Sequence, residues 1–173
     1  MMKKCFVLLL FAAATAFAQT DRASAYNNWG VYCIESGILD EAIEAFTEAI
    51  RLKADFVEAY YNRGLAYDNK GDTDRAIADF TEAIRCNPNL AEAYNNRGIA
   101  YAAKGEYDKA IVDYNQALAL NPNLAMVYLN RGFAYVMKQD YTRARSDWEK
   151  ALQLDPNDTQ ARKGLEILRK EGH

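Results

Sequence analysis

Apolar and aromatic residues recur along most of the chain at the spacing of amphipathic helices, and short polar turns interrupt them. Residues 91–120 contain two such stretches. Their regularly spaced small or aromatic positions are Tyr94, Gly98 and Tyr101, then Ala110, Tyr114 and Ala117. Gly105 separates the stretches and suits a left-handed turn, and Pro122 follows them and cannot continue a helix. The pattern predicts two helices that form a hairpin.

This hairpin pattern occurs four times, with a period of 34 residues. The period is kept by the glycines Gly30, Gly64, Gly98 and Gly132 and by the aromatic residues Phe46, Phe80, Tyr114 and Trp148. The repeats span residues 23–56, 57–90, 91–124 and 125–158. In residues 159–171, Ala161, Leu165 and Leu168 form one apolar stripe. We expect a capping helix there, because a stack of repeats needs a polar outer face for solubility.

Turn and cap residues can be assigned from the same repeat. Gly37 and Gly71 occupy the turn position in the first two repeats, whereas the fourth repeat has Gln139. Asp55 and Asn89 each stand three residues before a glutamate, which is the spacing of a capping box. We therefore expect Asp55 and Asn89 to cap the first helices of the second and third repeats.

The order Tyr-x-x-x-Gly-x-x-Tyr, then Ala-x-x-x-aromatic, then Pro resembles the tetratricopeptide repeat over residues 23–158. The resemblance implies an all-α fold, a right-handed α-solenoid of four helix hairpins plus the C-terminal capping helix. It also implies that the first helices line a concave groove, where this family typically binds peptides.

One position departs from the family pattern, which usually has leucine before the glycine. Here the position holds Trp29, Arg63, Arg97 and Arg131. Sixteen residues later, the second helices carry Ala45, Asp79, Asp113 and Asp147. The repeats with arginine have aspartate, and the repeat with tryptophan has alanine. We predict three partly buried ion pairs with a structural role, and the alternative is that the arginines bind an acidic ligand.

A column of asparagines is the candidate binding surface, at Asn28, Asn62, Asn96 and Asn130. It resembles the asparagine ladder with which some tetratricopeptide proteins hold a peptide backbone, because a carboxamide both donates and accepts hydrogen bonds. The alternative is that asparagine is only tolerated on a wet helix face. The other predicted contacts are Asn27, Tyr61, Asn95 and Phe133. A clamp for a terminal carboxylate is not favoured, since its cationic positions are missing.

The composition argues against several classes of function. With 21 Lys and Arg against 24 Asp and Glu, the net charge is −3, which does not favour nucleic acid as a partner. The only histidine is His173, the last residue. No nucleophile–histidine–acid set, paired-cysteine metal spacing or glycine-rich phosphate loop is visible. We expect no enzyme activity, no cofactor and no metal.

The N-terminus has the features of a cleaved secretory signal. Lys3 and Lys4 precede an apolar run of 12 residues from Cys5 to Ala16, and Ala16-Phe17-Ala18 fits a cleavage site. The run is shorter than the roughly 20 residues of a membrane span. We expect residues 1–18 to be removed and residues 19–173 to form one domain, exported to the periplasm or secreted, without membrane insertion of the mature chain.

These observations predict a non-catalytic scaffold that binds a protein or an extended peptide, as an adaptor, chaperone or assembly factor of the bacterial envelope. The alternative is a structural subunit that self-associates into a homo-oligomer through the fourth repeat. The apolar residues on the first helix of that repeat are Met126, Leu129, Phe133, Val136 and Met137. They either form an exposed contact site or are partly covered by the capping helix.

Overall fold

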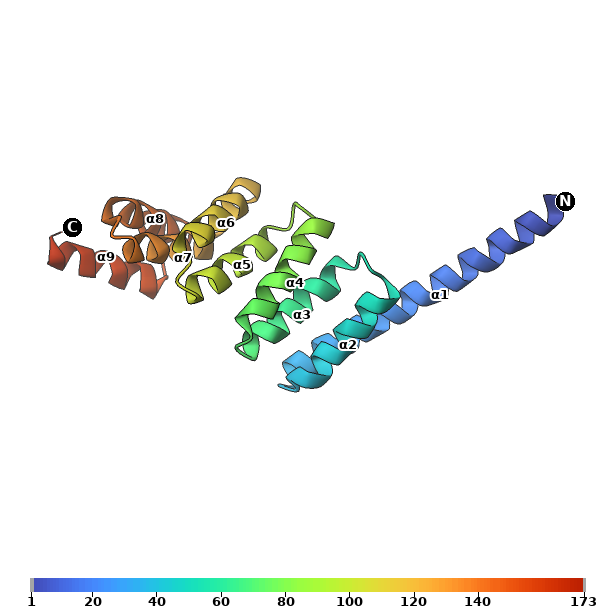
Figure 1. The fold of residues 1–173 in the computed structure, drawn as a ribbon. Helices are drawn as coiled ribbons and strands as arrows, with labels where there is room; N and C mark the ends of the chain where they lie inside the picture. The colour runs from blue at the N-terminus through green and yellow to red at the C-terminus, as the bar shows by residue number, and fades with distance from the viewer. Residues whose placement is uncertain (1, 173) are drawn as a thin grey trace. The chain divides into compact units, whose positions relative to one another are not determined.

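The computed structural model describes residues 2–172, with side chains described for residue 18 and for residues 20–172. The described chain is helical and contains no strand, which confirms the all-α prediction. The helices are α1 Met2–Glu35, α2 Leu39–Leu52, α3 Val57–Asn69, α4 Thr73–Cys86, α5 Ala91–Ala103, α6 Tyr107–Leu120, α7 Ala125–Met137, α8 Tyr141–Leu154 and α9 Thr159–Glu171 (Figure 1). None of the helices in the described part has the length and apolarity needed to cross a membrane. The signal peptide predicted at residues 1–18 falls largely on undescribed side chains and stays a prediction.

The helices form two compact units, one ending at Cys86 and one beginning at Asn87. In the first unit α1 packs on α2, α3 packs on α4, and α2 packs on α3. In the second unit α5 packs on α6, α7 on α8, α6 on α7, and α8 on α9. Each predicted repeat therefore contains one hairpin. Within a unit, neighbouring hairpins join through the second helix of one and the first helix of the next.

An aromatic ring against a glycine closes each hairpin. A Cβ atom added to Gly98 would lie 2.7 Å from Cε1 of Tyr114, and one added to Gly64 would lie 2.7 Å from Cε1 of Phe80. Real Cβ atoms do not come this close, so any larger residue would separate the helices. Both rings are buried among alanines of the second helix, which leave room for this close approach.

The predicted capping boxes are wrong. The N-cap residues of α3 and α5 are Phe56 and Leu90, and neither helix has a side-chain cap; Asp55 and Asn89 lie one residue too early. Phe56 is buried in a cluster with Ala49 and Ala59. Packing of an apolar residue thus sets the start of α3. Side-chain caps are made instead by Asp72, Asp140 and Asp158, at α4, α8 and α9.

The turn between the two helices of each hairpin is left-handed. Gly37, Gly71 and Gly105 have φ angles of 75°, 79° and 77°. Gln139 occupies the same turn with φ 61° and is the non-glycine residue of the described chain in this conformation. The turn geometry is therefore kept in the fourth repeat, although its residue carries a Cβ atom that strains it.

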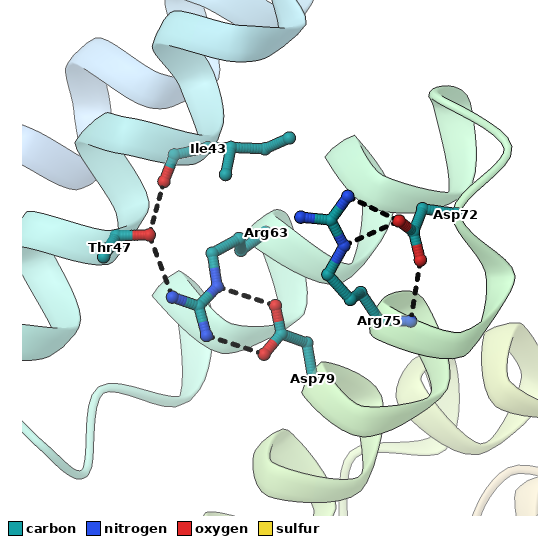
Figure 2. Close-up of polar contacts among 6 residues, drawn as sticks. All are labelled: Ile43, Thr47, Arg63, Asp72, Arg75 and Asp79. Carbon is teal, nitrogen blue, oxygen red and sulfur yellow. Dashed lines mark hydrogen bonds and ion pairs between the residues drawn. The ribbon is translucent and has the colours of Figure 1, made fainter.

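The three arginines predicted to lie inside the hairpins make two-pronged ion pairs there. Arg63 donates from Nε and Nη2 to the two carboxylate oxygens of Asp79, at 2.7 and 2.8 Å (Figure 2). The pairs Arg97–Asp113 and Arg131–Asp147 have the same geometry at 2.7–2.8 Å. Burial works to lower the pKa of Arg63, but the hydrogen bonds to Asp79 and the charges of Asp79 and the nearby tyrosines together outweigh it, and the pKa rises. The guanidinium therefore stays charged.

The same arginines also link neighbouring hairpins, which the sequence did not indicate. Nη1 of Arg63 donates to Oγ1 of Thr47 on α2, at 2.9 Å, and Thr47 donates in turn to the carbonyl oxygen of Ile43 (Figure 2). Nη1 of Arg131 donates to Oδ1 of Asn115 on α6, at 2.5 Å. In these repeats one side chain thus fixes both the hairpin and its packing on the hairpin before it.

Removing one member of a buried pair should cost far more than removing an exposed one. We expect Arg63→Ala to lower the free energy of unfolding by about 3–5 kcal/mol, because it leaves the buried Asp79 carboxylate without its partner. Arg75 forms an exposed pair with Asp72 in the same hairpin (Figure 2), and Arg75→Ala should leave the unfolding midpoint nearly unchanged. Urea unfolding followed by circular dichroism measures both.

The double variant Arg63→Leu, Asp79→Ala tests the coupling between the two residues. It copies the apolar exchange that the first repeat makes with Trp29 and Ala45. We expect it to recover most of the lost stability, since no charge is then left buried. Additive effects of the single changes in this cycle would show that the pair is not coupled.

Relieving the strain in the fourth turn should stabilise the protein. The left-handed conformation costs a residue with a Cβ atom roughly 1–2 kcal/mol, and the greater freedom of glycine in the unfolded chain offsets part of this. We expect Gln139→Gly to raise the free energy of unfolding by about 0.5–1 kcal/mol. A Cβ atom at Gly105 would meet nothing within 4 Å, so the reverse control Gly105→Gln isolates the backbone effect and should be destabilising. The same direction of change in both variants would contradict this account.

Candidate functional site

The predicted asparagine column lies on the first helix of each hairpin. Asn28 belongs to α1, Asn62 to α3, Asn96 to α5 and Asn130 to α7. Asn28 is exposed, and the other three are half-buried. Their contact with a peptide stays a prediction.

Two of these asparagines bind an asparagine of the preceding hairpin. Nδ2 of Asn62 donates to Oδ1 of Asn27 at 3.1 Å, and Nδ2 of Asn130 donates to Oδ1 of Asn95 at 3.2 Å. Asn27 is only 9% exposed. The sequence predicts a ligand contact for Asn27, whereas its burial and this hydrogen bond assign it to the packing between α1 and α3. These amide–amide hydrogen bonds thus connect the first helices of neighbouring hairpins within a unit.

The residue that accepts the amide–amide hydrogen bond, Asn27 or Asn95, is not an asparagine in every repeat. The position of Asn27 and Asn95 is held by Tyr61 in the second repeat and by Leu129 in the fourth. The ring of Tyr61 lies 5.9 Å from that of Phe80, and Leu129 is buried in the core. Asn95 also donates from Nδ2 to Oδ1 of Asn96, at 3.1 Å. This position therefore serves the packing of the hairpins in all four repeats.

The first helix of the fourth repeat has an apolar face that is partly covered. Leu129 is buried beside Leu168 of α9, and Val136 packs against the same cluster. Met126, Phe133 and Met137 remain 65%, 41% and 59% exposed. The sequence left open whether this face is an exposed contact site or is covered by the tail. In the structure one part of the face, with Leu129 and Val136, is covered, and the other part, with Met126, Phe133 and Met137, is exposed.

An open groove of about 350 Å³ lies where α7, α8 and α9 meet. Phe133 and Val136 line it from α7, Tyr141 and Trp148 from α8, and Ile167 from α9. The rings of Phe133 and Trp148 meet edge to face, with centroids 5.1 Å apart. Polar side chains contributed by α9, namely Gln160, Lys163 and Glu171, also line this groove. Of its residues, the sequence predicted Phe133 as a peptide contact and offered Val136 as part of a possible exposed contact site.

Trp148 builds the floor of this groove. Its Nε1 donates to the carbonyl oxygen of Leu129 at 3.2 Å. Its ring lies between two glycines, since a Cβ atom added to Gly132 or Gly164 would come within 2.4 Å of it. Gly164 stands 34 residues after Asn130, where the asparagine column would continue. The signal in the sequence that could have revealed this groove is the larger ring of Trp148 together with Gly164 in the tail.

The groove and the amides provide binding chemistry. An apolar cleft with a few polar groups at its edge holds an apolar side chain and orients the chain that carries it. Over the described residues, no group of three or more His, Cys, Asp or Glu side chains is placed to hold a metal ion. Asn62 and Asn130 each use one amide hydrogen in the bond to the preceding hairpin, so their oxygens can still accept hydrogen bonds from a ligand.

Comparison with known families and structures agrees with this architecture. Family models described as tetratricopeptide repeat match residues 57–90, 91–124 and 125–158, and one described as TPR repeat matches residues 30–71. The first three matches coincide with the second, third and fourth repeats read from the sequence. No curated protein matches the chain.

Several solved structures are similar to the chain. MamA (41 to the end) from Desulfovibrio magneticus RS-1 is 27% identical, with a TM-score of 0.82 over 88% of each chain. A tetratricopeptide repeat protein from Parabacteroides merdae is 25% identical, with a TM-score of 0.77 over 87% of this chain and 61% of that one. The first TPR of Spaghetti (RPAP3), bound to the HSP90 peptide SRMEEVD, is 29% identical, with a TM-score of 0.65 over 66% of this chain and 91% of that one.

The matched family models cover residues 30–158, which is more than half of the chain. The matches at 57–90, 91–124 and 125–158 are 34 residues apart, which is the period of the hairpins. The chain belongs to the tetratricopeptide repeat family.

Proposed function

We propose that the protein is a non-catalytic adaptor, chaperone or assembly factor that binds an extended segment of a partner protein along its first helices. Tetratricopeptide repeats mediate protein–protein interactions, and their scaffold is generally non-catalytic. The similar first TPR of Spaghetti (RPAP3) is bound to a peptide. In this chain, the asparagines and the apolar groove supply the two kinds of contact that an extended segment needs.

The groove between α7, α8 and α9 is the observation that carries this proposal. Phe133 lies three residues after Asn130 on α7, so the two side chains are neighbours on the helix surface. An amide that can bind a peptide backbone therefore stands beside a cleft that can hold an apolar side chain. This combination fits a peptide with an apolar anchor residue.

We place this activity in an exported protein of the bacterial envelope. Two lysines, an apolar run and a small-residue cleavage site in residues 1–18 support this location. The partner is then another exported protein or the exposed part of a membrane protein.

A self-associating structural subunit is the second candidate function. Met126 and Met137 support it, because they extend the exposed apolar face of α7 beyond the groove. Exposed apolar patches on a soluble protein often mark interfaces. The two candidates differ in whether α7 contacts a partner or a second copy of the chain.

A charge in the groove should abolish partner binding. We expect Phe133→Glu to reduce capture of the partner about tenfold or more, because the variant loses the apolar ring that lines the cleft and a bound segment would have to desolvate the new carboxylate. The measurement is chemical crosslinking in the native envelope fraction, with the captured proteins quantified by mass spectrometry. Val112→Glu is the matched control, since Val112 is 65% exposed on α6 and does not line the groove.

The control variant should capture the partner as the wild type does. Equal losses in both variants, or none in either, would argue against the groove as the binding site. Light scattering across protein concentration separates the second candidate. If the wild type is a dimer and Phe133→Glu dissociates it, the function of the groove is self-association and not partner binding.

The proposed export makes a separate prediction about the mature N-terminus. We expect the protein isolated from the native cells to begin at Gln19, because Ala16 and Ala18 satisfy the small-residue requirement of signal cleavage. Intact-mass measurement tests this. A mass that includes residues 1–18 would contradict cleavage and leave the binding proposal unaffected.

A further inference from the structure

We propose that the first hairpin carries a second binding site, which takes the cationic side chain of an arginine or lysine from a partner protein. An open cavity of about 300 Å³ lies between α1 and α2. The residues that line it are Tyr26, Trp29, Glu41, Glu44, Ala45 and Glu48. Aromatic faces and carboxylates are the two groups that bind an organic cation.

The third repeat shows what this cavity replaces. A cavity of about 310 Å³ lies at the same place between α5 and α6. Four of its lining residues, Arg97, Lys109, Val112 and Asp113, are the repeat equivalents of Trp29, Glu41, Glu44 and Ala45. Two cations have become a tryptophan and a glutamate, a valine has become a glutamate, and the aspartate has become an alanine. The lining of the cavity therefore changes from two cations and two carboxylates in the third repeat to three carboxylates and no cation in the first repeat.

The other repeats fill this position with their own guanidinium group. Cζ of Arg63, Arg97 and Arg131 lies 5.8, 5.7 and 5.5 Å from the ring centroid of the tyrosine three residues earlier. Tyr26 is the equivalent tyrosine in the first repeat. The first hairpin thus keeps the ring that faces a cation elsewhere, but it has no arginine to place there. A guanidinium from another protein can take this position.

The carboxylates provide the charge for such a ligand. Glu41, Glu44 and Glu48 lie at helical spacing on one side of α2. Arg51 neutralises Glu48 at 2.6 Å, and the charge of Arg22 also acts on Glu48. Among the described side chains, Glu41 and Glu44 make no ion pair. The cavity therefore presents two carboxylates that a bound cation would neutralise.

An exposed aromatic ring in the lining of the cavity also supports a cation site. Trp29 is 54% exposed, and its ring stacks on that of Tyr32, with centroids 5.4 Å apart and planes 26° apart. Tyr32 is itself 56% exposed. A planar guanidinium stacks on an indole face, and the stem of lysine or arginine covers apolar surface. The cavity is small for a folded element and suits one long side chain.

This site is independent of the proposed peptide groove. None of the asparagine positions lines the cavity, and all its residues belong to α1 and α2. A partner with a basic segment could therefore bind here whether or not α7 binds a peptide.

Nuclear magnetic resonance of the two indole groups tests the proposal on the purified protein. We expect acetyl-Gly-Arg-Gly-amide to shift the indole N–H signal of Trp29 saturably and to leave that of buried Trp148 unchanged. The matched peptide with citrulline, which is neutral and nearly isosteric with arginine, should produce no shift. An equal response to citrulline, or a shift of Trp29 with protein concentration alone, would overturn the proposal.

Two variants keep the test specific. Glu41→Gln with Glu44→Gln should weaken binding of the arginine peptide about tenfold, because both unpaired charges are lost. Trp29→Arg with Ala45→Asp rebuilds the ion pair of the other repeats and should abolish binding while the protein stays folded. Backbone amide shifts of residues 41–48 report binding in this variant. Wild-type affinity in either folded variant would overturn the proposal.

Discussion

The buried arginine–aspartate pair is the interaction on which the rest of the structure depends. Its two parallel hydrogen bonds fix how the two helices of a hairpin align, and in two repeats the remaining nitrogen binds the hairpin before it. Arg63 is therefore fully used inside the fold. The most conspicuous charges of the chain are structural. The surfaces that we propose for recognition are therefore the amides, the apolar groove and the hairpin that lacks the pair.

Much of the fold follows from residues that recur at one period. The left-handed turns at Gly37, Gly71 and Gly105 follow from the sequence, because their position and their conformational need coincide. The arginine pairs follow because Trp29 and Ala45 change together. The starts of α3 and α5 were predicted wrongly from the sequence. Asp55 has the spacing of a cap, but the burial of Phe56 places the start of α3 one residue later, and a capping motif contains no information about burial.

The candidate site was less predictable, because it depends on contacts between repeats. The column through Asn28 and Asn130 is visible in the sequence, but the bond from Asn62 to Asn27 depends on how hairpins stack. A pattern within one repeat cannot show that a predicted ligand contact such as Asn27 is used in the packing between hairpins. The groove under Phe133 likewise needs Gly164, which lies in the tail beyond the last repeat.

Departures from the repeat are a better guide to selectivity than the repeated residues. Duplication copies a residue whatever its use, so four asparagines in a column carry limited weight. Trp29 breaks the pattern by leaving an indole 54% exposed where the other repeats place an arginine in a mostly buried ion pair. Trp148 breaks the pattern by the size of its ring, which lies between Gly132 and Gly164 of α9. The altered hairpin of the first unit changes the lining of a cavity that the third repeat also has, and the altered hairpin of the second unit supplies the ring that forms the floor of the groove. These two changes are the reason why we propose contacts outside the chain at these two places.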